Sequence, residues 1–195
     1  MLSPWRLATA RLILTPVAPA DLRDISSLKA DPRAFAPMLG GVRSKLRSAE
    51  ELAEDIQFWG AHGFGMWAVR ARAGNAFMGI AGLLDREDGR GIALRFALWP
   101  QARGIGLASE AAGAALVYAH ETAGLAKVVA IAREDNYASR MVIGAIGMTE
   151  VDRFMRDGAL RLVYQSTRNG RSAGRAAPET VANSPDLQAG VNSSP

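Results

Sequence analysis

A short glycine-containing turn, residues 101–108, joins a strand-like run ending at Trp99-Pro100 to a long alanine-rich stretch with helical spacing. In this setting Gly104 and Gly106 allow successive backbone N–H groups to converge on one anion. The N-terminus of the following helix adds roughly +0.5 of an elementary charge at the same place. The sequence therefore predicts a phosphate-binding turn, while a structural turn that needs glycine only for its geometry remains the alternative.

Two common phosphate-binding motifs fit this turn poorly. A P-loop requires Gly-Lys-Ser/Thr, but Leu107, Ala108 and Ser109 follow Gly106. A dinucleotide-binding fold repeats β-α-β units around a parallel sheet, whereas here an antiparallel meander precedes the turn and only one crossover follows it. The sequence disfavours both motifs.

The length of 195 residues and the 49% hydrophobic content suit one domain with a sizeable core. We expect this domain to span residues 1–167. Residues 168–195 are rich in Gly, Ala, Ser, Pro and Asn without apolar periodicity, so we expect a disordered C-terminal tail. The chain has no cysteine and only two histidines, which excludes thiolate chemistry and leaves little for a metal site.

The net charge of +4 comes from basic residues scattered along the chain without a run of five, so we expect no nucleic-acid partner. No apolar run reaches the ~18 residues of a membrane span, and the N-terminal apolar stretch is too short for a signal peptide. We therefore expect a cytoplasmic protein without a membrane partner. The edge strands of the last expected hairpin would allow a homodimer.

Alternating and helical apolar patterns, interrupted by glycine and proline, give the order of the expected elements. Strands are expected at 12–14, 64–70, 77–84, 92–98, 127–132, 149–156 and 159–166, and helices at 19–30, from 48 to about 60, at 105–123 and at 137–146. These elements predict an α/β (α+β) fold with a mixed, mostly antiparallel central sheet flanked by helices.

This order of elements, with the pattern Gln101-x-x-Gly104-x-Gly106-x-Ala108, resembles the GNAT family of acyl-CoA-dependent N-acetyltransferases, in which the motif binds pyrophosphate. The resemblance extends through residues 9–14, 63–69 and 78–83 and through Asn136-x-x-Ser139 before Gly147-Met148. These segments look like the RimJ/RimL-type branch, which acetylates ribosomal-protein N-termini and has many small-molecule relatives. The match covers roughly residues 9–166.

The resemblance implies that the expected strands 92–98 and 127–132 diverge, and that the pantetheine arm of acetyl-CoA binds in the gap like an added strand. Asn136 is expected to cap the next helix and to orient the pantetheine. Arg103 either adds a charge-assisted contact to the pyrophosphate or stays solvated. The residues expected to bind this cosubstrate are Phe96, Leu98, Gln101, Ala102, Arg103, Gly104, Ile105, Gly106, Leu107, Ala108 and Asn136.

Ser139 stands where this branch places the acid that protonates the departing CoA thiolate, so the resemblance implies a catalytic role for it. The alternative is a first-turn serine that hydrogen-bonds the helix backbone. Tyr137 is a weaker candidate for the same role.

The sequence departs from the family at the expected base. Many relatives have Glu-Ile-Gly in the strand before the turn, where this chain has Ala93-Leu94-Arg95. Arg95 either forms a salt bridge, which we slightly favour, or attracts an anionic substrate. The other conceivable bases, each more typical of a solvated surface, are Glu134, Asp135, Asp85 and His62. Glu110 in the first turn of the expected helix is assigned to the helix dipole.

The predicted function is transfer of an acetyl group from acetyl-CoA to a primary amine by direct attack on the thioester. The acceptor is a protein N-terminal α-amine or, almost equally, a small amine. An α-amine with a pKa near ~8 is already partly neutral, so it depends less on a base than a lysine-like amine does. The missing carboxylate supports the alternative, a non-catalytic acyl-CoA-binding or sensor domain.

Overall fold

The computed structural model describes residues 4–38, 40–86 and 88–168. These residues form one eight-stranded sheet in the order β1-β2-β3-β4-β5-β6-β8-β7. The strands are β1 (Leu7–Ala8), β2 (Leu12–Pro16), β3 (Met66–Ala71), β4 (Phe77–Arg86), β5 (Gly91–Leu98), β6 (Lys127–Arg133), β7 (Thr149–Arg156) and β8 (Ala159–Thr167). All neighbouring strands are antiparallel except β5 and β6, which confirms the predicted mixed α/β fold.

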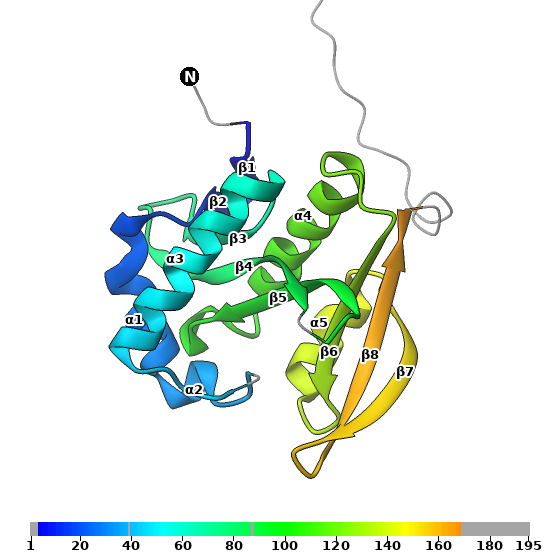
Figure 1. Cartoon of the computed structure of the whole chain (residues 1–195). Coiled ribbons are helices and arrows are strands. Elements are labelled where there is room, and N and C mark those ends of the chain that lie inside the picture. Colours follow the sequence, from blue (N-terminus) through cyan, green and yellow to red (C-terminus); the bar gives the residue numbers. More distant parts are fainter. Residues whose placement is uncertain (1–3, 39, 87, 169–195) are drawn as a thin grey trace, which may run out of the picture.

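Helices cover both faces of this sheet (Figure 1). They are α1 (Leu22–Ala30), α2 (Pro32–Phe35), α3 (Lys45–His62), α4 (Leu107–Glu121) and α5 (Tyr137–Ala145). Helices α1 and α3 lie in front of the sheet in the view of Figure 1, and α4 and α5 lie behind it. No helix in the described ranges is long and apolar enough to span a membrane.

The centre of the sheet opens between β5 and β6. β5 pairs with β4 from Gly91 to Leu98, but its ladder with β6 has one register pair, Ala93 with Val129. Beyond that pair the two strands diverge, as the resemblance to the family implied. In the described residues β5 has no register pair with β6 beyond Ala93, so the backbone groups of Phe96 and Leu98 that face β6 lack a ladder partner.

Three local features differ from the sequence expectation. Helix α3 begins at Lys45 because Ser44, rather than Ser48, is its N-cap: the Ser44 hydroxyl accepts a hydrogen bond from the Arg47 N–H at 3.1 Å. Ser48 is buried one turn inside the helix and donates to the Ser44 carbonyl. The short elements β1 and α2 lie outside the strands and helices expected from the sequence.

The ends of the chain lie largely outside the described residues. The expected tail, 168–195, is described only at Arg168, so its predicted disorder remains a prediction.

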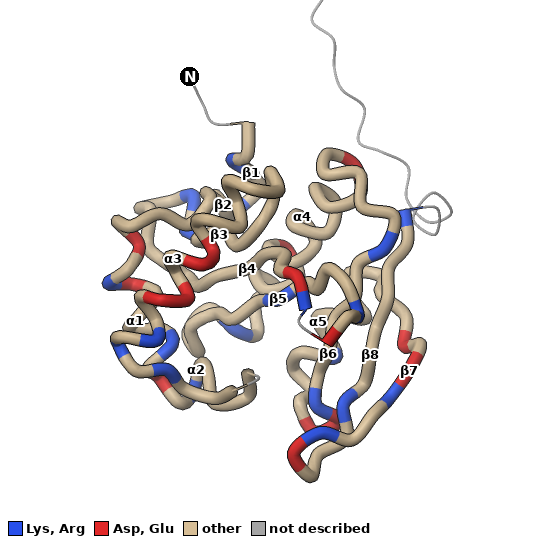
Figure 2. Tube along the Cα trace, viewed as in Figure 1, with Lys and Arg blue, Asp and Glu red and all other residues tan. Residues whose placement is uncertain are grey.

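Figure 2 shows cationic and anionic residues interspersed over helices α1–α3 and strands β6–β8.

Gly82 shows how closely the strands approach one another at the centre of the sheet. A Cβ at this position would lie 2.4 Å from the Gly65 carbonyl oxygen and 2.5 Å from the Met66 Cα, both backbone atoms. We expect Gly82→Ala to lower the free energy of unfolding by about 3 kcal/mol, because the backbone must shift. Gly60→Ala, at an exposed helical glycine with open space around it, is expected to raise it by about 0.5–1 kcal/mol. Urea denaturation measures the free energy of unfolding of both variants. Equal changes in the two would contradict the close strand approach at Gly82.

Candidate active site

The predicted phosphate-binding turn lies at the N-terminus of α4. Gly104 (φ 76°) and Gly106 (φ 80°) both adopt the left-handed conformation that side chains rarely tolerate. Gly106 is the N-cap of α4, and the first helical hydrogen bond runs from the Glu110 N–H to its carbonyl. The N–H groups of the first helical turn have no acceptor within the helix, so they are available to an anion.

A small network braces this turn against the N-terminal strands. Arg11 donates from Nη1 to the Ile105 carbonyl at 2.7 Å and from Nε to the Glu110 carboxylate at 2.6 Å. Thr9 also donates to Glu110. Glu110 therefore has a structural role in fixing the turn, in line with its assignment to the helix terminus rather than to catalysis.

The remaining residues expected to bind the cosubstrate surround the turn. Gln101 and Ala102 belong to a 3-10 turn, Pro100–Ala102, in which Ala102 is buried. The Arg103 guanidinium donates to the Arg33 carbonyl at 2.9 Å and to the Leu98 carbonyl at 3.4 Å. Its predicted contact with pyrophosphate remains a prediction, because these two carbonyls engage the side chain in the structure.

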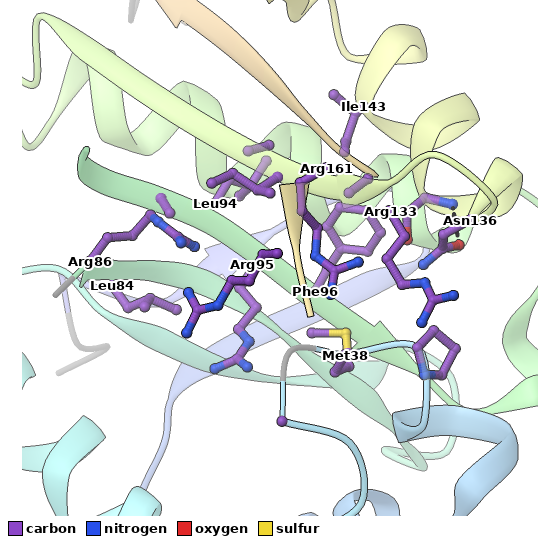
Figure 3. A pocket seen from close by; sticks show the side chains of 18 of the residues that line it. Met38, Leu84, Arg86, Leu94, Arg95, Phe96, Arg133, Asn136, Ile143 and Arg161 are labelled. Atoms are coloured by element: carbon purple, nitrogen blue, oxygen red, sulfur yellow. Dashed lines mark hydrogen bonds between the residues drawn. The ribbon is translucent and has the colours of Figure 1, made fainter. Parts of the chain in front are cut away.

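A cavity of about 310 Å³ lies where β5 and β6 diverge. Its walls come from residues 36–41, from β4, β5 and β6, from the start of α5 and from the β7–β8 hairpin. Phe96, Asn136 and Ser139 all line it (Figure 3 labels the first two). The structure thus brings these three predicted residues together, whereas Leu98 and the turn 101–108 lie outside this lining.

Ser139, at the start of α5, is one of the residues that line this cavity. Its backbone N–H donates to the Asn136 side chain at 3.2 Å, so Asn136 caps α5 as predicted. Its Oγ makes no hydrogen bond to any residue in the described ranges. The alternative of a serine bonded to the helix backbone is therefore not what the structure shows. Tyr137 is exposed and its ring lies 5.4 Å from the Arg140 guanidinium.

The candidate bases are not in this cavity. The His62 ring nitrogen contacts the Phe58 carbonyl at 3.0 Å, and Asp135 is ion-paired with Arg133 at 2.6 Å. Glu134 is exposed. Among the described lining residues, Asp157 is the one carboxylate.

Comparison with known proteins identifies the domain. The family model described as "Acetyltransferase (GNAT) domain" matches residues 11–149. The chain belongs to the GNAT acetyltransferase family. This match confirms the family that the order of the elements and the glycine turn resembled. The domain is therefore an acyltransferase domain.

Solved GNAT structures share the fold over most of this chain. An acetyltransferase from Agrobacterium tumefaciens superposes with a TM-score of 0.74 at 27% identity, covering 85% of this chain and 96% of its own. A ribosomal-protein-S5-alanine acetyltransferase from Vibrio fischeri superposes with a TM-score of 0.70 at 12% sequence identity. The match covers 84% of this chain and 97% of that protein. Spermidine N-acetyltransferase from Vibrio cholerae, solved with CoA and spermine, superposes with a TM-score of 0.68 at 17% sequence identity. The match covers 83% of this chain and 98% of that enzyme.

A second cavity of this GNAT domain, about 560 Å³, lies between α3 and the sheet. Arg95 and Arg86 line both cavities, and Asp85 lines this second one. Glu51 on α3 binds the Lys29 ammonium at 2.7 Å and the Arg43 guanidinium at 2.6 Å. Burial lowers the pKa of the Arg95 guanidinium, while the Glu51 carboxylate nearby opposes that shift.

Asp55 on α3 was not identified from the sequence. Burial raises the pKa of its carboxyl to about 6, against the opposing attraction of Lys29 and Arg95. The helical pattern places it among the polar residues of α3, so no sequence signal marked it. Arg161 was also missed, although an arginine within the apolar run of β8 is a detectable signal.

The raised pKa of Asp55 predicts a pH-dependent stability. Between the unfolded value of 3.8 and about 6 the folded state binds more protons, so stability falls as the pH rises through this window. The Asn variant cannot titrate, so the free energy of unfolding of Asp55→Asn relative to wild type should increase by about 1–3 kcal/mol from pH 4 to pH 7. Urea denaturation across this range measures it. Glu121→Gln, at an exposed carboxylate, is the control, and a pH-independent Asp55→Asn difference would refute the assignment.

Proposed function

We propose that this GNAT domain transfers the acetyl group of acetyl-CoA to a primary amine. The observation that carries the proposal is the cavity between β5 and β6, whose described lining includes both Ser139 and Phe96 of β5, a strand with one register pair to β6. The phosphate-binding turn at α4 follows the same strand. The three features together suit a long cosubstrate with a pyrophosphate at one end and a thioester at the other.

The proposed reaction is a direct acyl transfer. The neutral amine attacks the thioester carbonyl carbon, so that a C–N bond forms and the C–S bond breaks. A backbone N–H of β5 near Phe96–Leu98 is suited to stabilise the developing oxyanion. The Ser139 hydroxyl protonates the departing thiolate and recovers its proton from solvent.

The amine must lose a proton to solvent, because the family carboxylate is replaced by Ala93-Leu94-Arg95. This favours an acceptor with an α-amine, whose pKa near ~8 leaves it partly neutral at physiological pH. We take a protein N-terminal α-amine, the acceptor of the RimJ/RimL-type branch, as the first choice and a small amine as the second.

Release of free CoA thiol tests the proposal. The full chain is mixed with acetyl-CoA and a panel of N-terminal peptides, amino acids, polyamines and aminoglycosides. We expect CoA release that depends on an amine, together with a product heavier by one acetyl group. Tight acetyl-CoA binding without turnover on any amine would instead support the non-catalytic binding domain.

A further inference from the structure

The cavity between β5 and β6 is unusually rich in positive charge. Its described lining contains five arginines and one carboxylate: Arg86, Arg95, Arg133, Arg156, Arg161 and Asp157. Figure 3 shows Arg161 between Arg95 and Arg133, with Arg86 farther toward the Arg95 side. A cavity for a simple cationic amine would not be expected to gather guanidinium groups, because like charges repel.

The strand register places these arginines on one face of the sheet. Arg161 of β8 lies opposite Arg133 of β6, and Ala93 of β5 lies opposite Val129 of β6. Side chains two residues apart in a strand share a face, so Arg95, Arg133 and Arg161 all project from the same one.

This face is the one that α3 covers. The charge of Arg95 interacts with those of Glu51 and Asp55, both on α3. Helices α4 and α5 lie against the opposite face, and the phosphate-binding turn stands at the start of α4 (Figure 1). The arginines therefore lie across the sheet from the turn, and the cavity joins the two faces through the gap between β5 and β6.

Among the described residues Arg161 forms no ion pair, and the carboxylate whose charge acts on it, Asp135, is ion-paired with Arg133. Arg161 is 8% exposed, and its Nη1 has no hydrogen-bond partner among the described residues. Arg133 binds Asp135 at 2.6 Å, and Arg86 binds Asp88. A buried guanidinium nitrogen without a partner is costly, so a site that retains one is suited to an anion that arrives with the ligand.

We propose that the acceptor is a primary amine that also carries a carboxylate, and that Arg161, beside Arg133, binds this carboxylate. The proposal rests on the proposed acetyl transfer and specifies its substrate class. A planar guanidinium matches a carboxylate through two parallel hydrogen bonds. The carboxylate is supplied either by a free amino acid or by a short peptide with an acidic side chain near its N-terminus. A polyamine, which has no anionic group, is excluded as the acceptor.

Matched amines test this substrate class. Each of a set of amino acids is compared with its C-terminal amide, alongside Ala-Asp and Ala-Asn amides and spermidine. We expect the acids to have a KM about ten- to a hundredfold lower than their amides, the range of a charge-assisted hydrogen bond. Amine basicity cannot produce this preference, since a nearby carboxylate keeps the amine protonated and less reactive. Preference for Ala-Asp amide alone would identify the peptide as the source.

Three variants assign the effect to Arg161. Arg161→Gln should raise the KM for the acid about ten- to a hundredfold while leaving the KM for the amide and the dissociation constant of acetyl-CoA unchanged. Arg161→Lys should recover part of the loss. Arg153→Gln, at an exposed β7 arginine outside both cavity linings, is the matched control. Thermal unfolding checks that each variant is folded, and Arg161→Met, which removes the unpartnered charge, should be at least as stable as wild type.

The outcomes separate this inference from the proposed function. Calorimetric titration of each acid and amide into the protein–CoA complex reports binding without turnover. Equal binding within every matched pair, Ala-Asp and Ala-Asn amides included, or no binding of any amine that carries a carboxylate, overturns the inference even where acetylation is observed. Loss of acetyl-CoA affinity in Arg161→Gln also overturns it, because the arginine would then serve a CoA phosphate. Selective binding of acids without acetylation of any amine upholds the anion site and refutes the transferase.

Discussion

Replacing Ser139 with alanine is expected to lower kcat roughly a hundredfold while leaving the dissociation constant of acetyl-CoA nearly unchanged. Ser139 lines the cavity and its hydroxyl has no hydrogen-bond partner among the described residues, so under the proposed mechanism it can donate to a departing thiolate. Its loss removes an interaction made in the transition state rather than in the bound state. Steady-state kinetics with saturating acetyl-CoA and amine measure kcat, and calorimetry measures cosubstrate affinity.

Two further variants make the Ser139 result specific. Ser27→Ala removes a helix serine that donates to the Arg23 carbonyl, as an ordinary structural serine does, and it should leave kcat unchanged. Tyr137→Phe should also leave kcat unchanged, because Tyr137 does not line the cavity. A normal kcat in Ser139→Ala with a loss in Tyr137→Phe would transfer the acid role to the tyrosine.

The order of the elements was predictable because each depends on local patterns. The divergence of β5 from β6 was implied by the resemblance to relatives, and the glycine turn before α4 by the spacing of Gly104 and Gly106, while its binding of phosphate stays a prediction. The predicted N-cap of α3 was wrong by one turn. Ser44 and Ser48 both fit a capping pattern, and only the burial of Ser48 in the folded protein distinguishes the helical serine from the cap. Local sequence carries no information on that burial.

The acceptor side was least predictable from the sequence. Arg161 and Arg95 lie on different strands, and their common face is fixed by the register across β5, β6 and β8. The pKa of the Asp55 carboxyl is raised by burial in the folded protein, and the neighbouring residues in the helix sequence do not reveal that burial. The sequence indicated that the family base is absent, and the structure adds that the charged residues of the described cavity lining are five arginines and one carboxylate.

Replacing Gly106 with valine is expected to weaken acetyl-CoA binding at least a hundredfold. Gly106 has φ 80° at the N-cap of α4, a conformation that costs a side chain about 1–2 kcal/mol and that a β-branched residue avoids. Relief of this strain turns the first N–H groups of α4 away from a common point. Convergence of those groups is what a pyrophosphate requires, so calorimetric titration of CoA should detect the loss.

Gly124→Val is the matched control, because it imposes the same strain beyond the other end of α4. Gly124 has φ 69° and open space around it, and it lies outside the turn. Both variants should lose a similar free energy of unfolding, about 1–2 kcal/mol, while only Gly106→Val loses CoA affinity. Unchanged CoA affinity in Gly106→Val would mean that the turn has only a structural role. An equal loss of CoA affinity in both variants would attribute the effect to the stability of α4 rather than to the N–H groups at its start.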